Sequence, residues 1–374
     1  MAATPTPSLT LAETRESLIG AVAAADYFAL AYIQLCGLSY WPNPAQIPQL
    51  VADPSQVTPW GDGRWACIWG PALDDEEANL VYVAAYYDKA TGLPVAAVVV
   101  VRGTDVTDDI WGDLKEAFED LDVPFQYPLP WLSGSAARVA GGTLDALTTI
   151  EGFTSGGRTL RQFLAGFLGN PANEKPVLVV TGHSLGGCVA TVLAPWLQWS
   201  LATGGVNVPT VPATFAAPTA GNAAFAQYFG STFQYAPRYF NTLDAVPCGW
   251  ADIDRIKTIY DQNGLSTPEI IKLTLDGFQF AIREGGASYA QPACLGELNG
   301  YFCLGFDWYQ QISTQHDHRT YIALMQGQAP QCFLSTQARK RRYSHEDRTA
   351  TLGAAAEAAA APPGDAAQPP NPVA

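Results

Sequence analysis

Short apolar runs alternate with segments of helical periodicity along most of the chain. An apolar run predicts a strand where β-branched and aromatic residues dominate it and turn residues bound it. Strands are expected at 79–87, 95–101, 176–180, 211–218 and 237–241. The DKATGLP segment between the first two predicts a hairpin, and PVLVV at 176–180 is typical of a strand buried on both faces of a parallel sheet.

Apolar residues at helical spacing occur in the segments around these strands. The expected helices span 15–38, 141–168, 187–201 and 222–229. Alternating strands and helices predict an α/β fold, with a mostly parallel central sheet and helices on both faces.

The nearly uncharged stretch 18–38 is long enough to raise the question of a membrane span. Asp26 lies near its middle, and placing its carboxylate at the centre of a bilayer costs about 2.5–3.5 kcal/mol. The stretch is also rich in alanine. We therefore expect a packed surface helix and no transmembrane segment.

The composition changes after residue 334. The segment QARKRRYSHEDR is followed by an Ala/Pro-rich stretch that cannot bury enough apolar surface to order itself. We expect one domain over 1–334 and a disordered tail over 335–374. The RKRR run is interpreted as part of a solvated tail, with an address signal or a contact to an anionic surface as the alternatives.

Charge and cysteine content narrow the class of protein. The net charge of −15 argues against nucleic-acid binding, which needs a basic face. The seven cysteines include no CxxC pair, so no zinc site is expected. Free buried thiols are predicted, with a Cys294–Cys303 disulfide as the alternative in an oxidising compartment. The N-terminus has no basic region followed by an apolar one, so we expect no cleavable signal and a cytoplasmic location.

Ser184 stands in the sequence TGHSLGG, which fits the pattern G-x-S-x-G. A predicted strand enters this motif and a predicted helix leaves it. Such a strand-to-helix elbow holds the serine in a strained conformation with its hydroxyl exposed, and glycines at 182 and 186 allow the backbones to approach. Pro195 is expected to kink or end the following helix.

A serine hydroxyl needs a base, and the chain has four histidines. His183 is adjacent to the serine and is interpreted as structural, while His345 lies in the predicted tail. His316 and His318 remain as candidates. We expect His316 on a loop before a helix that Asp317 can cap, and His318 in the first turn of that helix.

The chain order Ser, Asp, His requires an acid between the serine and the base. Asp244 in NTLDAVP follows a predicted strand and suits this role. Asp252 and Asp254 are its rivals, but they are interpreted as residues at an exposed helix start. The oxyanion of acyl transfer needs fixed donors, which the Leu185 backbone N–H and Thr104, in a loop after a neighbouring strand, would supply.

Five stretches in this order resemble the class 3 lipases, a branch of the α/β-hydrolases: RGTDVTDDIWGDL, VAGGTLDAL, VTGHSLGG, TFAAPTAGNAAF and NTLDAVP. The likeness runs from about residue 79 to 325. It implies that Ser184 is the nucleophile, Asp244 the triad acid, and Thr104 with Leu185 the oxyanion hole. The later QH…TY…L pattern resembles bacterial members and favours His316 as base, whereas the spacing of fungal members would select His318.

The chain departs from the family pattern at four positions. Ala140 and Thr143 stand where the family often has histidine and phenylalanine, and Ala216 and Thr219 replace its usual glycine and arginine. These departures bear on the packing around the substrate pocket rather than on the reaction.

The resemblance implies a serine ester hydrolase that acts on acylglycerols through an acyl-serine intermediate. No cofactor or metal is expected, and the expected partners are a lipid or other ester substrate and a transient lipid interface. The alternatives are a phospholipase, a feruloyl-type esterase, and a catalytically silent lipid-binding scaffold.

An apolar stripe follows the predicted oxyanion loop at helical spacing. It consists of Ile110, Trp111, Leu114, Phe118 and Leu121. Its position next to Thr104 predicts a lid over Ser184, and the alternative is that it packs on the core.

Overall fold

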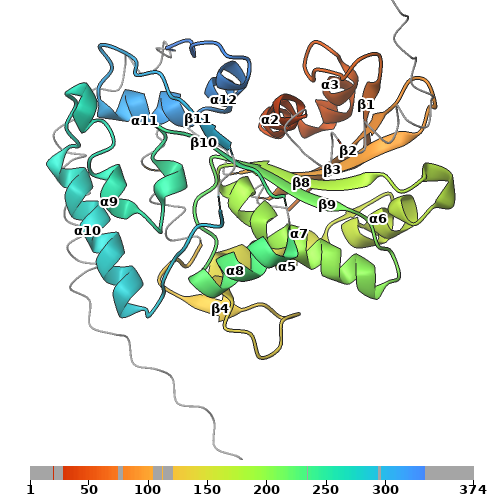
Figure 1. Ribbon diagram of the computed structural model, residues 1–374, viewed down its shortest axis with the longest axis horizontal. Helices are drawn as coiled ribbons and strands as arrows, with labels where there is room; N and C mark the ends of the chain where they lie inside the picture. Colours follow the sequence, from red (N-terminus) through yellow and green to blue (C-terminus); the bar gives the residue numbers. More distant parts are fainter. Residues whose placement is uncertain are drawn as a thin grey trace, which may run out of the picture.

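The computed structural model describes residue 20 and residues 28–74, 79–103, 112, 121–233, 235–293 and 296–332 (Figure 1). The predicted tail at 335–374 lies outside these residues, as does most of the expected helix at 15–38 before residue 28. A seven-stranded sheet runs through the middle of the fold, with helices on both of its faces.

The sheet has the strand order β1-β2-β3-β8-β9-β10-β11. The first three strands are antiparallel, and the remaining neighbours, from β3 to β11, are parallel. Their bounds are β1 Arg64–Leu73, β2 Leu80–Tyr87, β3 Pro94–Val101, β8 Val177–His183, β9 Thr210–Phe215, β10 Arg238–Asn241 and β11 Gly296–Leu298. The predicted α/β fold with a mostly parallel sheet is confirmed, and so is the β2–β3 hairpin.

The two faces of the sheet build two apolar cores. Along β3, Val98 and Val100 pack in the core shared with α2 (Ala29–Leu38) and α3 (Ile47–Ala52). Val99 and Val101 pack in the opposite core, under α5 (Gly141–Gly152), α6 (Leu160–Leu168), α7 (Leu185–Thr203) and α8 (Ala223–Thr232). Because successive side chains of a strand point to opposite faces, a run of valines serves both cores.

The expected helix at 141–168 is two helices, so that prediction is wrong. α5 (Gly141–Gly152) and α6 (Leu160–Leu168) are separated by a small hairpin of β6 (Thr154–Ser155) and β7 (Arg158–Thr159). Its turn residues Gly156 and Gly157 have φ values of 56° and 73°, which glycine adopts without strain. Thr159 and Gln162 then form a capping box that starts α6.

α7 (Leu185–Thr203) leaves the serine and continues through Pro195, so of the two expected outcomes, a kink or an end, the end is wrong. Most of its side chains are buried, and this packing outweighs the backbone hydrogen bond that a proline cannot donate. Of the described helices, α7 is the one whose length and composition would suit a membrane span, but 78% of that window is buried in the fold.

The other helices lie over the ends and flanks of the sheet. α8 is Ala223–Thr232, α9 Ile253–Ile256, α10 Glu269–Glu284, α11 Trp308–His316 and α12 His318–Met325. β4 (Gln126–Pro128) and β5 (Arg138–Ala140) form a further two-stranded sheet. In α2, Tyr32, Ile33 and Leu35 are fully buried, as expected for a packed helix.

The cysteine pairing differs from the expectation. Cys303 and Cys332 form a disulfide with their Cα atoms 5.8 Å apart, whereas free thiols or a Cys294–Cys303 bond were expected. The reason is tertiary, because α11 and α12 turn back and bring Cys332 next to Cys303. The other described cysteines are free, and burial raises the pKa of the Cys36 and Cys188 thiols to about 12.

Candidate active site

Ser184 lies at a sharp turn between β8 and α7. Its φ of 59° and ψ of −133° are unusual for a residue with a side chain, and its N–H donates to the Phe215 carbonyl at 2.9 Å. A Cβ on Gly182 would lie 2.2 Å from the Gly186 carbonyl oxygen, and one on Gly186 would lie 2.3 Å from the Val101 oxygen. Both glycines are therefore required by the close approach of backbones in this elbow.

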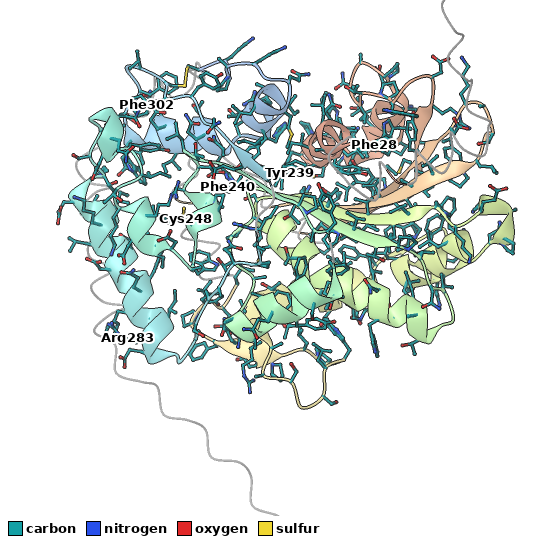
Figure 2. All side chains as sticks on the ribbon, viewed as in Figure 1. Phe28, Tyr239, Phe240, Cys248, Arg283 and Phe302 are labelled. Carbon is teal, nitrogen blue, oxygen red and sulfur yellow. A yellow bond between two sulfur atoms is a disulfide. The ribbon has the colours of Figure 1, made fainter. Side chains whose placement is uncertain are left out.

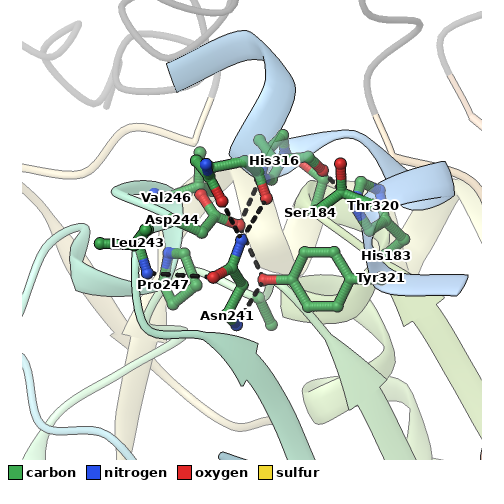
Figure 3. A network of polar contacts seen from close by, with 12 residues as sticks. His183, Ser184, Asn241, Leu243, Asp244, Val246, Pro247, His316, Thr320 and Tyr321 are labelled. Atoms are coloured by element: carbon green, nitrogen blue, oxygen red, sulfur yellow. Dashed lines mark hydrogen bonds and ion pairs between the residues drawn. The ribbon is translucent and has the colours of Figure 1, made fainter. Parts of the chain in front are cut away.

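The serine hydroxyl belongs to an unbroken chain of three side chains (Figure 3). Ser184 Oγ lies 2.8 Å from His316 Nε2, and His316 Nδ1 lies 2.9 Å from Asp244 Oδ2. The side chains come from the β8–α7 turn, the C-terminal end of α11 and the loop after β10. All three residues are buried, which shields their interactions from bulk water.

The position of His316 differs in detail from the expectation of a loop. It is the last residue of α11, and Asp317 then caps α12 by accepting the Arg319 N–H at 2.8 Å. The N-cap role expected for Asp317 is therefore confirmed. His318 begins α12 and stacks on the ring of Tyr40 at 5.6 Å, so the structure does not bring it to the serine.

Tyr321 and Val246 orient the carboxylate of Asp244. The Tyr321 hydroxyl donates to Oδ2 at 2.7 Å, and the Val246 N–H donates to Oδ1 at 2.9 Å. Tyr321 also accepts the Asn241 N–H at 3.0 Å. The sequence motif contained this tyrosine, but no role could be assigned to it there.

The rival carboxylates lie elsewhere. Asp254 is exposed and pairs with Lys257 at 2.8 Å rather than with His316. Asp252 holds the N-cap position of α9, but its side chain makes no capping hydrogen bond. Asp252 therefore lies at the start of a helix, as predicted, but its side chain does not form the hydrogen bond that an N-cap residue usually makes.

His183 binds the backbone of His316. Its Nε2 lies 2.8 Å from the His316 carbonyl oxygen, and its Nδ1 lies 3.0 Å from the Tyr40 hydroxyl. Since a carbonyl can only accept, Nε2 carries the proton and Nδ1 accepts from Tyr40. Burial, followed by the neighbouring imidazoles of His316 and His318, holds the pKa of His183 well below its usual value. Tyr40 had no signal in the sequence.

The second part of the predicted site is described only partly. Leu185 is the first residue of α7, where helix geometry leaves its N–H without an intrahelical acceptor. Thr104 lies outside the described residues. Gly103 precedes it, and a Cβ at Gly103 would lie 3.2 Å from Ser184 Cβ, so this loop passes directly beside the serine.

The predicted lid stripe also falls largely outside the described residues, namely at Ile110, Trp111, Leu114 and Phe118. Its remaining member, Leu121, is buried in the core.

The departures from the family pattern have local structural consequences. Ala216 stands at the usual glycine position and has a φ of 53°, the left-handed region that favours glycine. Thr219 replaces arginine, and its hydroxyl donates to the Gly249 carbonyl at 2.9 Å. Thr143 is buried beside the thiol of Cys188, with its Oγ1 3.8 Å from the sulfur. Ala140 is buried at the end of β5.

Residues 98–250 match the family model described as Lipase (class 3). Among solved structures, the chain is similar to the M37 lipase, with 26% identity, a TM-score of 0.65, and coverage of 86% of this chain and 96% of that one. No curated protein matches the sequence significantly.

Two further solved structures show weaker likeness. One is described as a triacylglycerol lipase whose catalytic centre is a serine protease triad, with 22% identity, a TM-score of 0.41, and coverage of 65% and 77% of the two chains. The other is the Rhizomucor miehei lipase propeptide complex, with 20% identity, a TM-score of 0.39, and coverage of 65% of each chain. The family match over 98–250 and the similarity to the M37 lipase are the stronger findings. On these grounds the chain is a carboxylic ester hydrolase of the lipase type, with an α/β-hydrolase fold.

Proposed function

We propose that the chain hydrolyses the esters of acylglycerols through an acyl-serine intermediate. Ser184 is the nucleophile, His316 the general base and acid, and Asp244 the carboxylate that fixes the imidazole tautomer. The observation that carries this proposal is the unbroken hydrogen-bonded chain Ser184–His316–Asp244, with links of 2.8 and 2.9 Å.

The geometry supports a two-step acyl transfer. His316 Nε2 accepts the hydroxyl proton as Ser184 Oγ attacks the ester carbonyl, and the same proton then passes to the departing alcohol. The bond between carbonyl carbon and alcohol oxygen breaks, and the acyl group stays on the serine. In the second step water gives a proton to His316 and attacks the acyl-serine, which releases the carboxylic acid and returns the proton to Ser184.

Charge develops in this reaction at two places. The imidazolium of His316 is stabilised by Asp244, whose two oxygens are held by Tyr321 and Val246. The oxyanion needs donors on the opposite side of the carbonyl carbon, and we assign these to the Leu185 N–H and to Thr104. No step requires a metal ion or an organic cofactor.

The class 3 lipase match and the similarity to the M37 lipase support acylglycerols over other esters. The interval between His316 and Tyr321 also suits the proposed closeness to bacterial members of the family. A phospholipase or a feruloyl-type esterase would use the same triad and differ in the substrate pocket.

Labelling with a fluorophosphonate tests the nucleophile, and a substrate panel tests the ester class. We expect labelling of wild-type chain at Ser184, loss of labelling in Ser184→Ala, and hydrolysis of p-nitrophenyl esters and emulsified triacylglycerol. A wild-type chain that neither labels nor turns over any ester would support the silent lipid-binding scaffold instead. Turnover confined to phospholipid would move the proposal to a phospholipase.

We also propose that the chain works in an oxidising compartment, in place of the cytoplasmic location expected from its N-terminus. The Cys303–Cys332 disulfide supports this, because such bonds persist mainly outside reducing compartments. Mass spectrometry of unreduced peptides from the native source should recover the two cysteines linked, and free thiols at both positions would contradict the proposal.

A further inference from the structure

Exposed apolar side chains of the described residues gather on one part of the surface. The described residues include nine large hydrophobic side chains that are exposed. Seven of the nine lie on α10 or on the two segments beside its ends. These seven are Phe125, Tyr127, Ile270, Leu273, Phe280, Tyr301 and Leu304. Single exposed hydrophobic residues are ordinary, but such a gathering marks a contact surface.

α10 has two apolar faces rather than one. Ile271, Leu275 and Phe278 are buried against the core. On the other side of the helix, Ile270, Leu273 and Phe280 are 36%, 56% and 56% exposed, and their spacing places them along one outward stripe. We call these three residues the outer apolar face. Core packing needs only the buried side of the helix, so it leaves the outer apolar face unexplained.

Exposed residues extend this face at the C-terminal end of α10. A Cβ on Gly285 would lie 2.0 Å from the Pro124 carbonyl oxygen, and the Gln126 side chain donates to the Ser288 carbonyl at 2.8 Å. These contacts hold β4 and the residues just before it against the end of α10. Phe125, before β4, and Tyr127, within it, are half exposed.

A second group of exposed residues extends the face at the N-terminal end. Trp308 at the start of α11 donates its indole N–H to Thr267, just before α10, at 3.1 Å. Leu304, in the loop before α11, is 88% exposed, and Tyr301 is half exposed. Figure 2 shows the neighbouring Phe302 and, at the other end of α10, Arg283, which mark the two limits of this side of the molecule.

This side of the molecule also carries the active site. Figure 1 shows α9, α10 and α11 together at one side, with α10 along the outer edge. α11 ends at His316, and Phe278 on the inner side of α10 packs on Trp250, which follows the Asp244 loop, at 6.3 Å. A surface that touched the outer apolar face would therefore lie beside the triad region.

The charges beside the face decide what kind of surface fits it. Lys257 pairs with Asp276 at 2.6 Å, Lys272 pairs with Glu269 at 3.8 Å, and Arg283 lies over the Phe280 ring at 5.7 Å. Anionic membranes attract clusters of basic residues, but here each lysine is matched by a carboxylate and the whole chain has a net charge of −15. The face therefore suits an uncharged apolar surface.

We propose that the outer apolar face of α10, with the exposed residues at its two ends, docks the enzyme on the surface of uncharged acyl lipid. This proposal rests on the proposed function, because it supplies the insoluble substrate to a site on the same side. Burial of these side chains in the lipid stabilises the adsorbed state, as it does for helices that lie in a membrane interface.

The test separates adsorption from hydrolysis. Full-length protein carrying Ser184→Ala is mixed with emulsified triolein, and the bound fraction is measured by flotation, so that substrate is not consumed. Leu273→Ser with Phe280→Ser in that background should weaken adsorption by at least about tenfold. The matched control is Trp199→Ser, which removes a side chain of similar exposure, 45%, at the far end of α7. It should adsorb as the parent does.

The same substitutions in the chain with Ser184 intact should leave hydrolysis of dissolved p-nitrophenyl butyrate within about twofold, because they do not touch the triad. If the double variant loses this activity, or if its circular dichroism spectrum shows that it is unfolded, Ile270→Ser alone provides the same test with a smaller change. Unchanged adsorption of correctly folded variants, or an equal loss in Trp199→Ser, would overturn the proposal.

Three other results have defined meanings. A wild-type chain that adsorbs through this face and hydrolyses no ester would support docking while the proposed function fails. Sedimentation that shows a dimer, converted to monomer by the double variant, would assign the face to a second copy and overturn the proposal. Adsorption that rises severalfold when anionic phospholipid is added would overturn the claim of an uncharged partner.

Discussion

Replacing His183 with phenylalanine tests whether the residue before the nucleophile positions the base. The substitution keeps a planar ring in the elbow but removes both ring nitrogens. It deletes the bond from Nε2 to the His316 carbonyl at 2.8 Å and the bond from the Tyr40 hydroxyl to Nδ1 at 3.0 Å. Neither bond reaches the substrate, so any effect on turnover must pass through the position of His316.

The expected magnitude follows from the buried position of these groups. Leaving the His316 carbonyl without this donor costs about 1–3 kcal/mol of folding free energy. A displacement of about 1 Å at a catalytic group can cost roughly 100-fold in rate. We therefore expect kcat to fall about 10- to 100-fold in His183→Phe while KM changes by less than about twofold, because His183 makes no contact with substrate in the proposed mechanism.

The assay is steady-state hydrolysis of dissolved p-nitrophenyl butyrate, combined with urea denaturation. His183→Gln is the conservative variant, since its amide N–H can still donate to the carbonyl, and it should recover part of kcat. His318→Phe is the matched control, because His318 also contacts Tyr40 but, within the described part of the chain, forms no hydrogen bond with Ser184, His316 or Asp244. Wild-type kcat in His183→Phe, or an equal loss in the control, would refute the positioning role.

His316→Ala should lower kcat by several orders of magnitude and His318→Ala by less than about tenfold, because the triad acts as a unit; the reverse pattern in ester hydrolysis would reassign the base. Tyr321→Phe removes the hydroxyl that donates to Asp244 and should lower the unfolding free energy by about 1–3 kcal/mol and kcat by roughly tenfold. An unchanged kcat there would show that the bond is structural alone. Burial lowers the folded-state pKa of both His183 and His318, and it outweighs the Asp317 carboxylate, which raises that of His318, so the unfolded chain binds more protons than the folded chain below about pH 6.5. The unfolding free energy should therefore fall as the pH drops below about 6.5, and urea titrations should show a shallower decline in the double variant His183→Phe/His318→Phe; an identical slope would exclude these imidazoles as its cause.

The strands that were predicted correctly carry a strong local signal. In β2, β3 and β8 nearly every residue is buried and most are apolar, which is the pattern of strands covered on both faces. β1 escaped prediction because its sequence RWACIWGPAL contains Gly70 and Pro71 and pairs with β2 through register shifts. A strand that owes its register to its neighbour has no regular alternation to reveal it.

Tertiary packing also explains the misplaced helix boundaries. The apolar spacing of 141–168 continues across the β6–β7 hairpin because both α5 and α6 bury one side against the same core. The turn residues Gly156 and Gly157 indicate the break between the two helices, whereas the apolar periodicity conceals it. At Pro195 the error was the opposite, since a local breaker is overridden by a helix that is buried along most of its length.

The choice between His316 and His318 shows why the triad could be only partly predicted. The order Ser, Asp, His along the chain limits the base to these two residues. They are close in the sequence, and only the direction in which each side chain points distinguishes them. His316 ends α11 and Asp317 turns the chain into α12, so the two imidazoles leave this corner on different helices. Asn241, at the end of β10, fixes the corner by donating to both the backbone and the side-chain oxygen of Gln315, at 2.9 and 2.8 Å.

The same corner links the acid to the base. Asn241 is followed by the turn that carries Asp244, and Tyr321 on α12 binds both the Asn241 N–H and the Asp244 carboxylate. The direction of His316 is therefore set by bonds that join the end of β10 and the following turn to α11 and α12, across about 75 residues of the chain. The spacing of residues around a single histidine cannot encode such a constraint. The bonds come from Asn241 and Tyr321, two polar residues that local sequence patterns do not single out. In the sequence, an asparagine three residues before Asp244 and a tyrosine five residues after His316 are the residues that form these bonds.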